Sequence, residues 1–123
     1  MVDCSCSISK ENLEPTMTFN EYEVFCASTA VYPKEKEMEY LGLAITEEAG
    51  EVAGKLKKIL RGDVPLDLEQ RTALLKECGD VLYYVTRMTN FLGCSLEEMA
   101  EMNRQKILTR VANGTIKGVG DNR

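Results

Sequence analysis

Helix start and stop signals divide most of this 123-residue chain into four segments, and they restrict its fold more than any other feature. Thr18 with Glu21, and Ser95 with Glu98, have the spacing of a capping box, in which each side chain bonds the other residue's backbone N–H. Asp67 is a further candidate N-cap. The helices predicted from these signals span approximately residues 18–31, 34–60, 67–92 and 95–113.

The breaks between the predicted helices are short. Pro33 ends the first segment, Arg61-Gly62-Asp63-Val64-Pro65 ends the second, and Gly93 ends the third. No stretch shows strand-like alternation of useful length. We therefore predict an all-α, four-helix bundle-like chain with one domain over residues 18–113, a flexible N-terminal arm (1–17) and a glycine-rich tail (114–123).

Charge and hydropathy exclude two classes of partner. The net charge of −5 argues against an electrostatic nucleic-acid binder, because no broad basic face is present. No apolar run approaches the roughly 20 residues that a membrane span needs. The N-terminus lacks the basic and apolar segments of a signal peptide, so we expect a cytoplasmic protein without nucleic-acid or membrane partners.

The second predicted helix places glutamates beside its apolar seam. The seam comprises Met38, Leu41, Ile45, Val52, Leu56 and Ile59. Glu48 fills a gap in it, where the spacing calls for an apolar residue. On a helical projection Glu48 lies roughly 50° from the seam centre, Glu51 roughly 110° and Glu47 about 150°.

The third predicted helix repeats this arrangement with Glu77 and Asp80. They lie roughly 60° and 120° from a seam formed by Leu74, Cys78, Val81, Val85, Met88 and Leu92. When the two seams pack, the acidic edges converge, and crowded carboxylates need a cation to neutralise them. The chain has no histidine, so the ligands are oxygens, which favours Mg²⁺ or Mn²⁺. The competing interpretation is a pair of solvated acidic faces.

Cationic side chains near the acids indicate a phosphate ligand. Lys55 and Lys58 continue the acidic edge of the second helix, and the fourth helix carries a polar stripe of Asn103, Lys106 and Arg110. A metal held by acids and rimmed by Lys and Arg is the arrangement expected for a polyphosphate. No P-loop motif is present, which excludes that class of nucleotide enzyme.

Together, Glu47-Glu48-x-x-Glu51 and Glu77-x-x-Asp80 resemble the double acidic signature of the all-α nucleoside triphosphate pyrophosphohydrolases, and most closely the short MazG-like proteins. The resemblance extends to the following segments: Gly79-Asp80-Val81-Leu82-Tyr83-Tyr84, Asn103-x-x-Lys106-x-x-x-Arg110 and Gly118-x-Gly120-Asp121-x-Arg123. It covers roughly residues 18–123.

This resemblance implies Mg²⁺-dependent hydrolysis of an NTP or dNTP between the α- and β-phosphates, giving a nucleoside monophosphate and pyrophosphate. It implies metal binding by Glu48, Glu51, Glu77 and Asp80, with Glu47 as an auxiliary. It also places Asn103, Lys106 and Arg110 near the nucleotide phosphates, and it implies a homodimer or homotetramer.

Other functions remain open from the sequence. The same fold could act on dUTP or dCTP, on phosphoribosyl-ATP or on an alarmone. A non-enzymatic helical module could instead use the acidic edge to bind a basic partner. The base would stack on tyrosine or phenylalanine, because tryptophan is absent.

Overall fold

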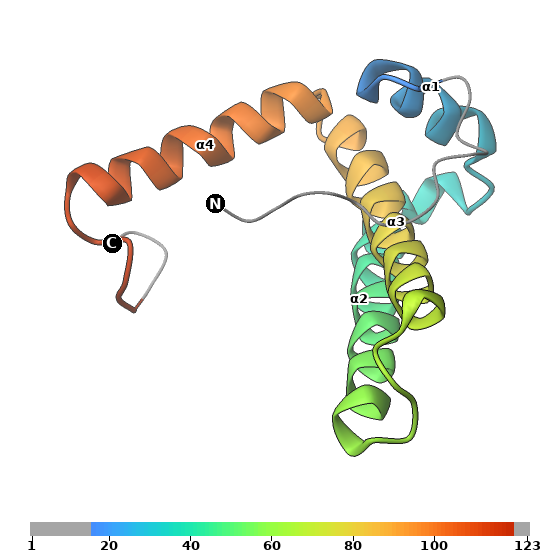
Figure 1. The fold of residues 1–123 in the computed structure, drawn as a ribbon. Helices are drawn as coiled ribbons and strands as arrows, with labels where there is room; N and C mark the ends of the chain where they lie inside the picture. The colour runs from blue at the N-terminus through green and yellow to red at the C-terminus, as the bar shows by residue number, and fades with distance from the viewer. Residues whose placement is uncertain (1–15, 120–123) are drawn as a thin grey trace.

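The computed structural model describes residues 16–119, which form four α-helices and one short 3₁₀ turn (Figure 1). The elements are α1 (Phe19–Thr29), η1 (Lys34–Lys36), α2 (Glu37–Arg61), α3 (Leu68–Phe91) and α4 (Leu96–Ala112). These described residues contain no strand, so the predicted all-α class is confirmed. None of these helices is long and apolar enough to cross a bilayer. Most of the predicted arm and part of the tail lie outside the described residues.

Local capping bonds fix the helix ends where the sequence predicts them. The Thr18 N–H donates to Glu21 Oε2 at 2.7 Å, and the Glu21 N–H donates to Thr18 Oγ1 at 3.2 Å. Ser95 and Glu98 make the same reciprocal pair at 2.8 and 3.1 Å. Each box satisfies backbone donors that the first helical turn leaves unpaired.

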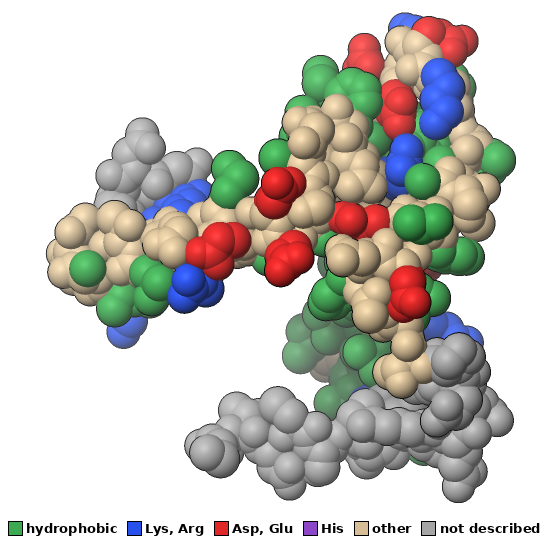
Figure 2. Space-filling view, turned by 90° about the horizontal axis from the view of Figure 1, so that it is seen from above, with side chains coloured by type: hydrophobic (Ala, Val, Ile, Leu, Met, Phe, Trp, Pro, Cys, Tyr) green, Lys and Arg blue, Asp and Glu red, His purple; other side chains and the backbone are tan. Residues whose placement is uncertain are grey.

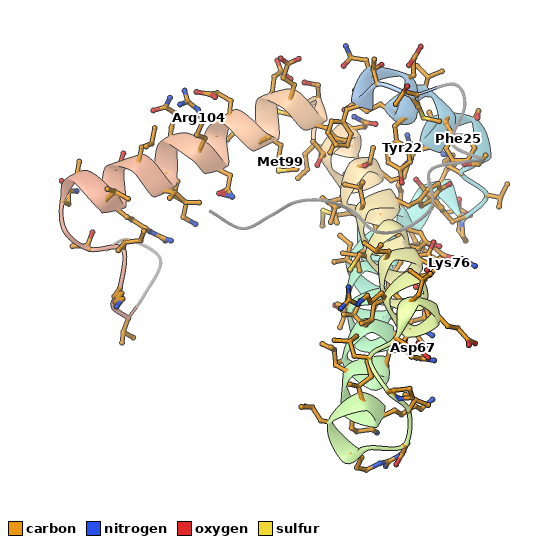
Figure 3. All side chains as sticks on the ribbon, viewed as in Figure 1. Tyr22, Phe25, Asp67, Lys76, Met99 and Arg104 are labelled. Carbon is orange, nitrogen blue, oxygen red and sulfur yellow. The ribbon has the colours of Figure 1, made fainter. Side chains whose placement is uncertain are left out.

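An antiparallel pair of long helices, α2 and α3, forms the body of the molecule (Figure 1). Gly62 ends α2 in the left-handed conformation, with φ of 80°, which a residue without Cβ adopts at little cost. Asp67 then caps α3 at the end of the pair away from α4 (Figure 3). Leu41 and Ala44 of α2 are buried.

The short helix α1 packs on α3 through a small set of contacts. Cys26 of α1 is fully buried. The Tyr83 hydroxyl of α3 donates to the Cys26 carbonyl at 3.3 Å and lies 2.9 Å from Thr29 Oγ1. These contacts hold α1 at the end of α3 that leads into α4.

The fourth helix projects away from the α2–α3 pair, so the predicted bundle is wrong in its arrangement (Figure 1). Within the described residues α4 contacts α1 and α3 but not α2. Its first N–H, on Leu96, donates to the Glu23 carboxylate of α1, which also accepts from Asn90 Nδ2 at 3.3 Å. A carboxylate at a helix N-terminus is favourable, and here it sets the direction in which α4 leaves α3.

The described chain buries few apolar side chains by itself. Those that are buried are Cys26, Leu41, Ala44 and Leu96. Several predicted seam residues remain open to solvent: Met38 is 53% exposed, Leu56 is 45% exposed, and Cys78 is exposed. Figure 2 shows hydrophobic side chains on the surface of both the α4 arm and the rest of the molecule. A two-helix contact covers less of each seam than a closed bundle does.

Candidate metal centre

Three acidic side chains from the two long helices meet at one place. One carboxylate oxygen from each of Glu48, Glu77 and Asp80 lies within 4.8 Å of the other two. Glu77 and Asp80 share a face of α3 because residues three apart lie one turn apart on a helix. The antiparallel packing of α2 against α3 supplies Glu48 from the opposite side.

The separation of these oxygens fits a hard divalent cation. Mg²⁺ binds oxygen at about 2.1 Å and Ca²⁺ at about 2.4 Å, so opposite ligands stand about 4.2 to 4.8 Å apart. The three oxygens all lie within this upper limit of one another, so one such ion could contact all three. Because all three donors are carboxylates, the chemistry of the set also suits a hard cation.

The electrostatics of the cluster favour binding of a cation. Burial raises the pKa of the Glu48 carboxyl, and the negative charges of Asp80, Glu47, Glu77 and Glu51 raise that pKa further. Ionised carboxylates this close repel one another unless a cation lies between them. A bound divalent ion would reverse both effects, because it favours the charged form of every ligand.

Glu47 and Glu51 lie next to this cluster but are not members of it. Both side chains are exposed, and neither joins the group of three within 4.8 Å. The structure therefore brings together three of the four predicted ligands and leaves Glu51 outside. Glu51 is still close enough for its charge to raise the pKa of Glu48.

The predicted phosphate-binding lysines of α2 have different surroundings. Lys55 Nζ lies 3.1 Å from Glu77 Oε1, so this lysine pairs directly with one of the clustered acids. Lys58, three residues later, is exposed. Lys55 is thus at the centre itself, whereas Lys58 lies on the surface beyond it.

The predicted phosphate-binding residues of α4 are not brought to the cluster within one chain. Asn103 and Lys106 are exposed and Arg110 is half-buried, all on the arm that leaves the α2–α3 pair. No described residue of α4 contacts α2, which carries Glu48. Within one chain these three residues therefore lie apart from the helix that carries Glu48.

A pocket of about 350 Å³ adjoins the cluster and has four tyrosines in its wall. Glu48 and Asp80 line it, together with Tyr32, Tyr40, Tyr83, Tyr84, Thr29 and Val31. The rings of Tyr32 and Tyr40 stack with centroids 5.0 Å apart, and Tyr83 meets Tyr84 edge to face at 5.1 Å. Burial raises the pKa of Tyr84 to about 12, so its hydroxyl stays protonated at neutral pH.

An ion-pair network holds one wall of this pocket. Arg87 Nε donates to the Tyr32 hydroxyl at 3.0 Å, which in turn donates to Glu37 Oε1 at 2.9 Å. Arg87 Nη2 also lies 3.4 Å from Glu37 Oε1, and the two side chains are only 11% and 14% exposed. No sequence spacing predicts this network, because Arg87 lies 50 residues from one partner and 55 from the other.

A larger groove, of about 1170 Å³, lies between the start of α1 and the first half of α4, away from the three clustered acids. Its apolar lining includes Phe19, Leu82, Leu96, Met99 and Met102. Figure 3 shows Met99 near the junction of α3 and α4. The groove shares no lining residue with the tyrosine pocket, and none of the clustered acids borders it.

Comparison with known proteins agrees with the site. Residues 36–115 match the family described as MazG nucleotide pyrophosphohydrolase domain, and all three clustered acids fall within that range. The chain is 37% identical over 109 residues to Gene 37 protein of Mycobacterium phage L5, covering 83% of this chain and 96% of that protein. No solved structure matches. The family is metal-dependent, in agreement with the acidic cluster. The chain belongs to the MazG nucleotide pyrophosphohydrolase family.

Proposed function

We propose that this protein hydrolyses nucleoside or deoxynucleoside triphosphates between the α- and β-phosphates, releasing a nucleoside monophosphate and pyrophosphate. The observation that carries the proposal is the meeting of Glu48, Glu77 and Asp80 within 4.8 Å, inside a domain of this family. The metal that fits best is Mg²⁺, with Mn²⁺ as a substitute, because both take oxygen ligands in a small site.

In this proposal Glu48, Glu77 and Asp80 hold the metal. Bound magnesium would shield the negative phosphates and lower the pKa of a water molecule. Glu51 or Glu47, the exposed carboxylates beside the cluster, would accept the proton that the attacking water loses. Water is thereby added across the α–β anhydride, and pyrophosphate leaves. In this assignment the three clustered acids bind the metal, and Glu47 and Glu51 take part in proton transfer.

We propose that the nucleoside occupies the tyrosine pocket. Glu48 and Asp80 line the same pocket as the tyrosines. Phosphates bound to a metal at these two acids would therefore place the base among Tyr32, Tyr40 and Tyr84. Its volume of about 350 Å³ falls in the usual range for small-molecule sites. Aromatic faces stack on any base, so we expect binding of several nucleotides with modest preferences.

We propose that the active form is a homo-oligomer with α4 of one subunit near the metal centre of another. Two observations support it: large apolar side chains remain exposed on α4 and α2, and α4 does not reach α2 of its own chain. Lys106 and Arg110 would then contact phosphates at the neighbouring centre. Whether the assembly is a dimer or a tetramer follows from its mass in solution.

A substrate panel tests the activity. The purified protein is incubated with Mg²⁺ and each NTP and dNTP, with phosphoribosyl-ATP and an alarmone as further arms, and the products are identified by chromatography. We expect pyrophosphate and the monophosphate from one or more triphosphates, and none in EDTA or with Asp80→Asn. Glu39→Gln, on the same helix as Glu48 but outside the cluster, is the matched active control. Absence of turnover and of any Mg²⁺ binding would instead favour a non-enzymatic acidic module.

Mixing two inactive variants tests the composite site. Asp80→Asn removes a metal ligand, and Lys106→Met removes a cation of α4. If the two residues act across subunits, hybrids in a dimer contain one intact site, and remixing restores about a quarter of wild-type activity. If they act within one chain, hybrids contain none. Recovery near zero would contradict the arrangement, provided that co-purification of differently tagged subunits confirms hybrid formation.

A further inference from the structure

The ion pair between Lys55 and Glu77 lies within the proposed metal centre. The ammonium nitrogen is 3.1 Å from a carboxylate oxygen of Glu77, whose side chain is one of the three clustered acids. The two side chains are 28% and 19% exposed, so both are partly shielded from water. A lysine therefore supplies positive charge at a cluster that otherwise consists of carboxylates.

A divalent ion and Lys55 compete for the same negative charge. The metal would draw on Glu77, and a second cation beside it would be repelled by like charge. A divalent ion held by Glu77 would take up part of the negative charge that attracts this ammonium group 3.1 Å away. Binding of the metal would therefore weaken this ion pair.

The position of Lys55 on α2 would let its ammonium group contact substrate phosphates at the metal centre. It follows Glu48 by seven residues, which is two helical turns, so it projects from the same face. The flexible four-carbon side chain of Lys55 could reach phosphates bound to a metal at Glu48. The freed ammonium then has a new anionic partner only when substrate is present.

We propose that Lys55 takes the place of the metal in the free protein and moves to the substrate phosphates when the metal binds. The proposal rests on the proposed function, and it adds regulation to the same site. The lysine makes metal binding weaker without substrate and substrate binding stronger with metal. Metal loading and nucleotide binding are coupled through one side chain, and in the free protein that side chain offsets one of the negative charges of the cluster.

Calorimetry with Mn²⁺ on the substrate-free protein is the first arm of the test. Lys55→Met removes the charge and keeps the apolar stem, and Lys55→Gln serves as a second variant with a polar end. We expect Mn²⁺ to bind about 2- to 5-fold more tightly to either variant, the range for loss of a partly exposed ion pair that the metal must weaken. Lys57→Met, which removes the same charge from an exposed position on α2, changes the affinity less than 2-fold.

The second arm measures binding of a triphosphate analogue with a non-hydrolysable methylene bridge between the α- and β-phosphates, with saturating Mn²⁺. We expect about 10-fold weaker binding to Lys55→Met, because the phosphates lose a cation. A lysine with a purely structural role would weaken both interactions when removed, so the opposite signs are diagnostic. Lys55→Arg, which retains the charge, keeps both affinities near those of the wild type.

The outcomes separate this inference from the proposed function. If wild-type protein binds Mn²⁺ and releases pyrophosphate but Lys55→Met binds Mn²⁺ no more tightly, the inference falls and the activity stands. If Lys55→Met binds the analogue as well as the wild type does, the transfer to phosphate is contradicted. If the wild type binds no metal at all, both proposals fail.

Discussion

Replacing Glu48 by glutamine should stabilise the metal-free protein and remove its response to metal. The substitution keeps the size of the side chain and removes one negative charge from the three-acid cluster. At 4.8 Å, the upper limit of the separations in the cluster, two unit charges in the dielectric of water repel by about 0.9 kcal/mol. Lys55 offsets the charge of Glu77, so the repulsion from Asp80 dominates. We expect a gain of about 1 kcal/mol in EDTA.

Metal reverses the order of stability. A ligand present at 100 times its dissociation constant adds about 2.7 kcal/mol to a protein that binds it only when folded. Wild type gains this amount and Glu48→Gln gains little, so the variant becomes the less stable protein in metal. In a chain of this size each kcal/mol corresponds to a change of about 4 °C in melting temperature.

Thermal denaturation with EDTA and with saturating Mn²⁺ measures both effects. Glu39→Gln is the control; it lies in the first turn of α2, where losing its charge costs about 0.3 kcal/mol in either buffer. A Glu48→Gln variant that is less stable than wild type in EDTA would refute the repulsion argument. One that keeps the full stabilisation by Mn²⁺ would remove Glu48 from the metal site.

Three further predictions concern the scaffold around the site. Arg87→Met leaves the partly buried Glu37 with only the exposed Lys34, 3.9 Å away, as a cation, and should cost about 2 kcal/mol in urea unfolding; a loss under 0.5 kcal/mol would contradict the network. Burial raises the pKa of Tyr32 and brings the pKa of Tyr84 to about 12, above the unfolded value of about 10. The two tyrosines therefore stabilise the fold fully below pH 10, and this contribution is lost as the pH rises toward 12. Urea unfolding midpoints should fall between pH 9 and pH 11, and constant midpoints would refute this. Ser95→Ala removes the cap of α4 and should lower stability by about 1 kcal/mol in urea unfolding, with Ser95→Thr largely retaining it; equal midpoints for the two variants would contradict the cap.

Local signals predict the helices because the interactions that end them are local. The capping boxes at Thr18 and Ser95, and the left-handed Gly62, act over three or four residues, and the sequence displays them directly. The direction of α4 is not local. It depends on Glu23 accepting the Leu96 N–H from 73 residues away, and no periodicity reveals that contact.

The acidic site is predictable in kind but not in its members. Helical projection places Glu51 and Asp80 at similar angles from their seams, yet only Asp80 joins the cluster. The difference comes from the rotation of α2 against α3, which side-chain packing decides. The pairing of Lys55 with Glu77 depends on the same rotation, since the residues lie on different helices. The tyrosine pocket gathers residues from three parts of the chain, and no motif joins them.

The central claim is tested most directly by ³¹P NMR of a triphosphate mixed with the protein and Mg²⁺. The account predicts signals of a nucleoside monophosphate and pyrophosphate, in equal amounts, which disappear with EDTA or with Asp80→Asn. A diphosphate with orthophosphate would place cleavage at the wrong bond. An unchanged spectrum for every triphosphate, with folded protein and saturating Mg²⁺, would contradict the proposed pyrophosphohydrolase activity.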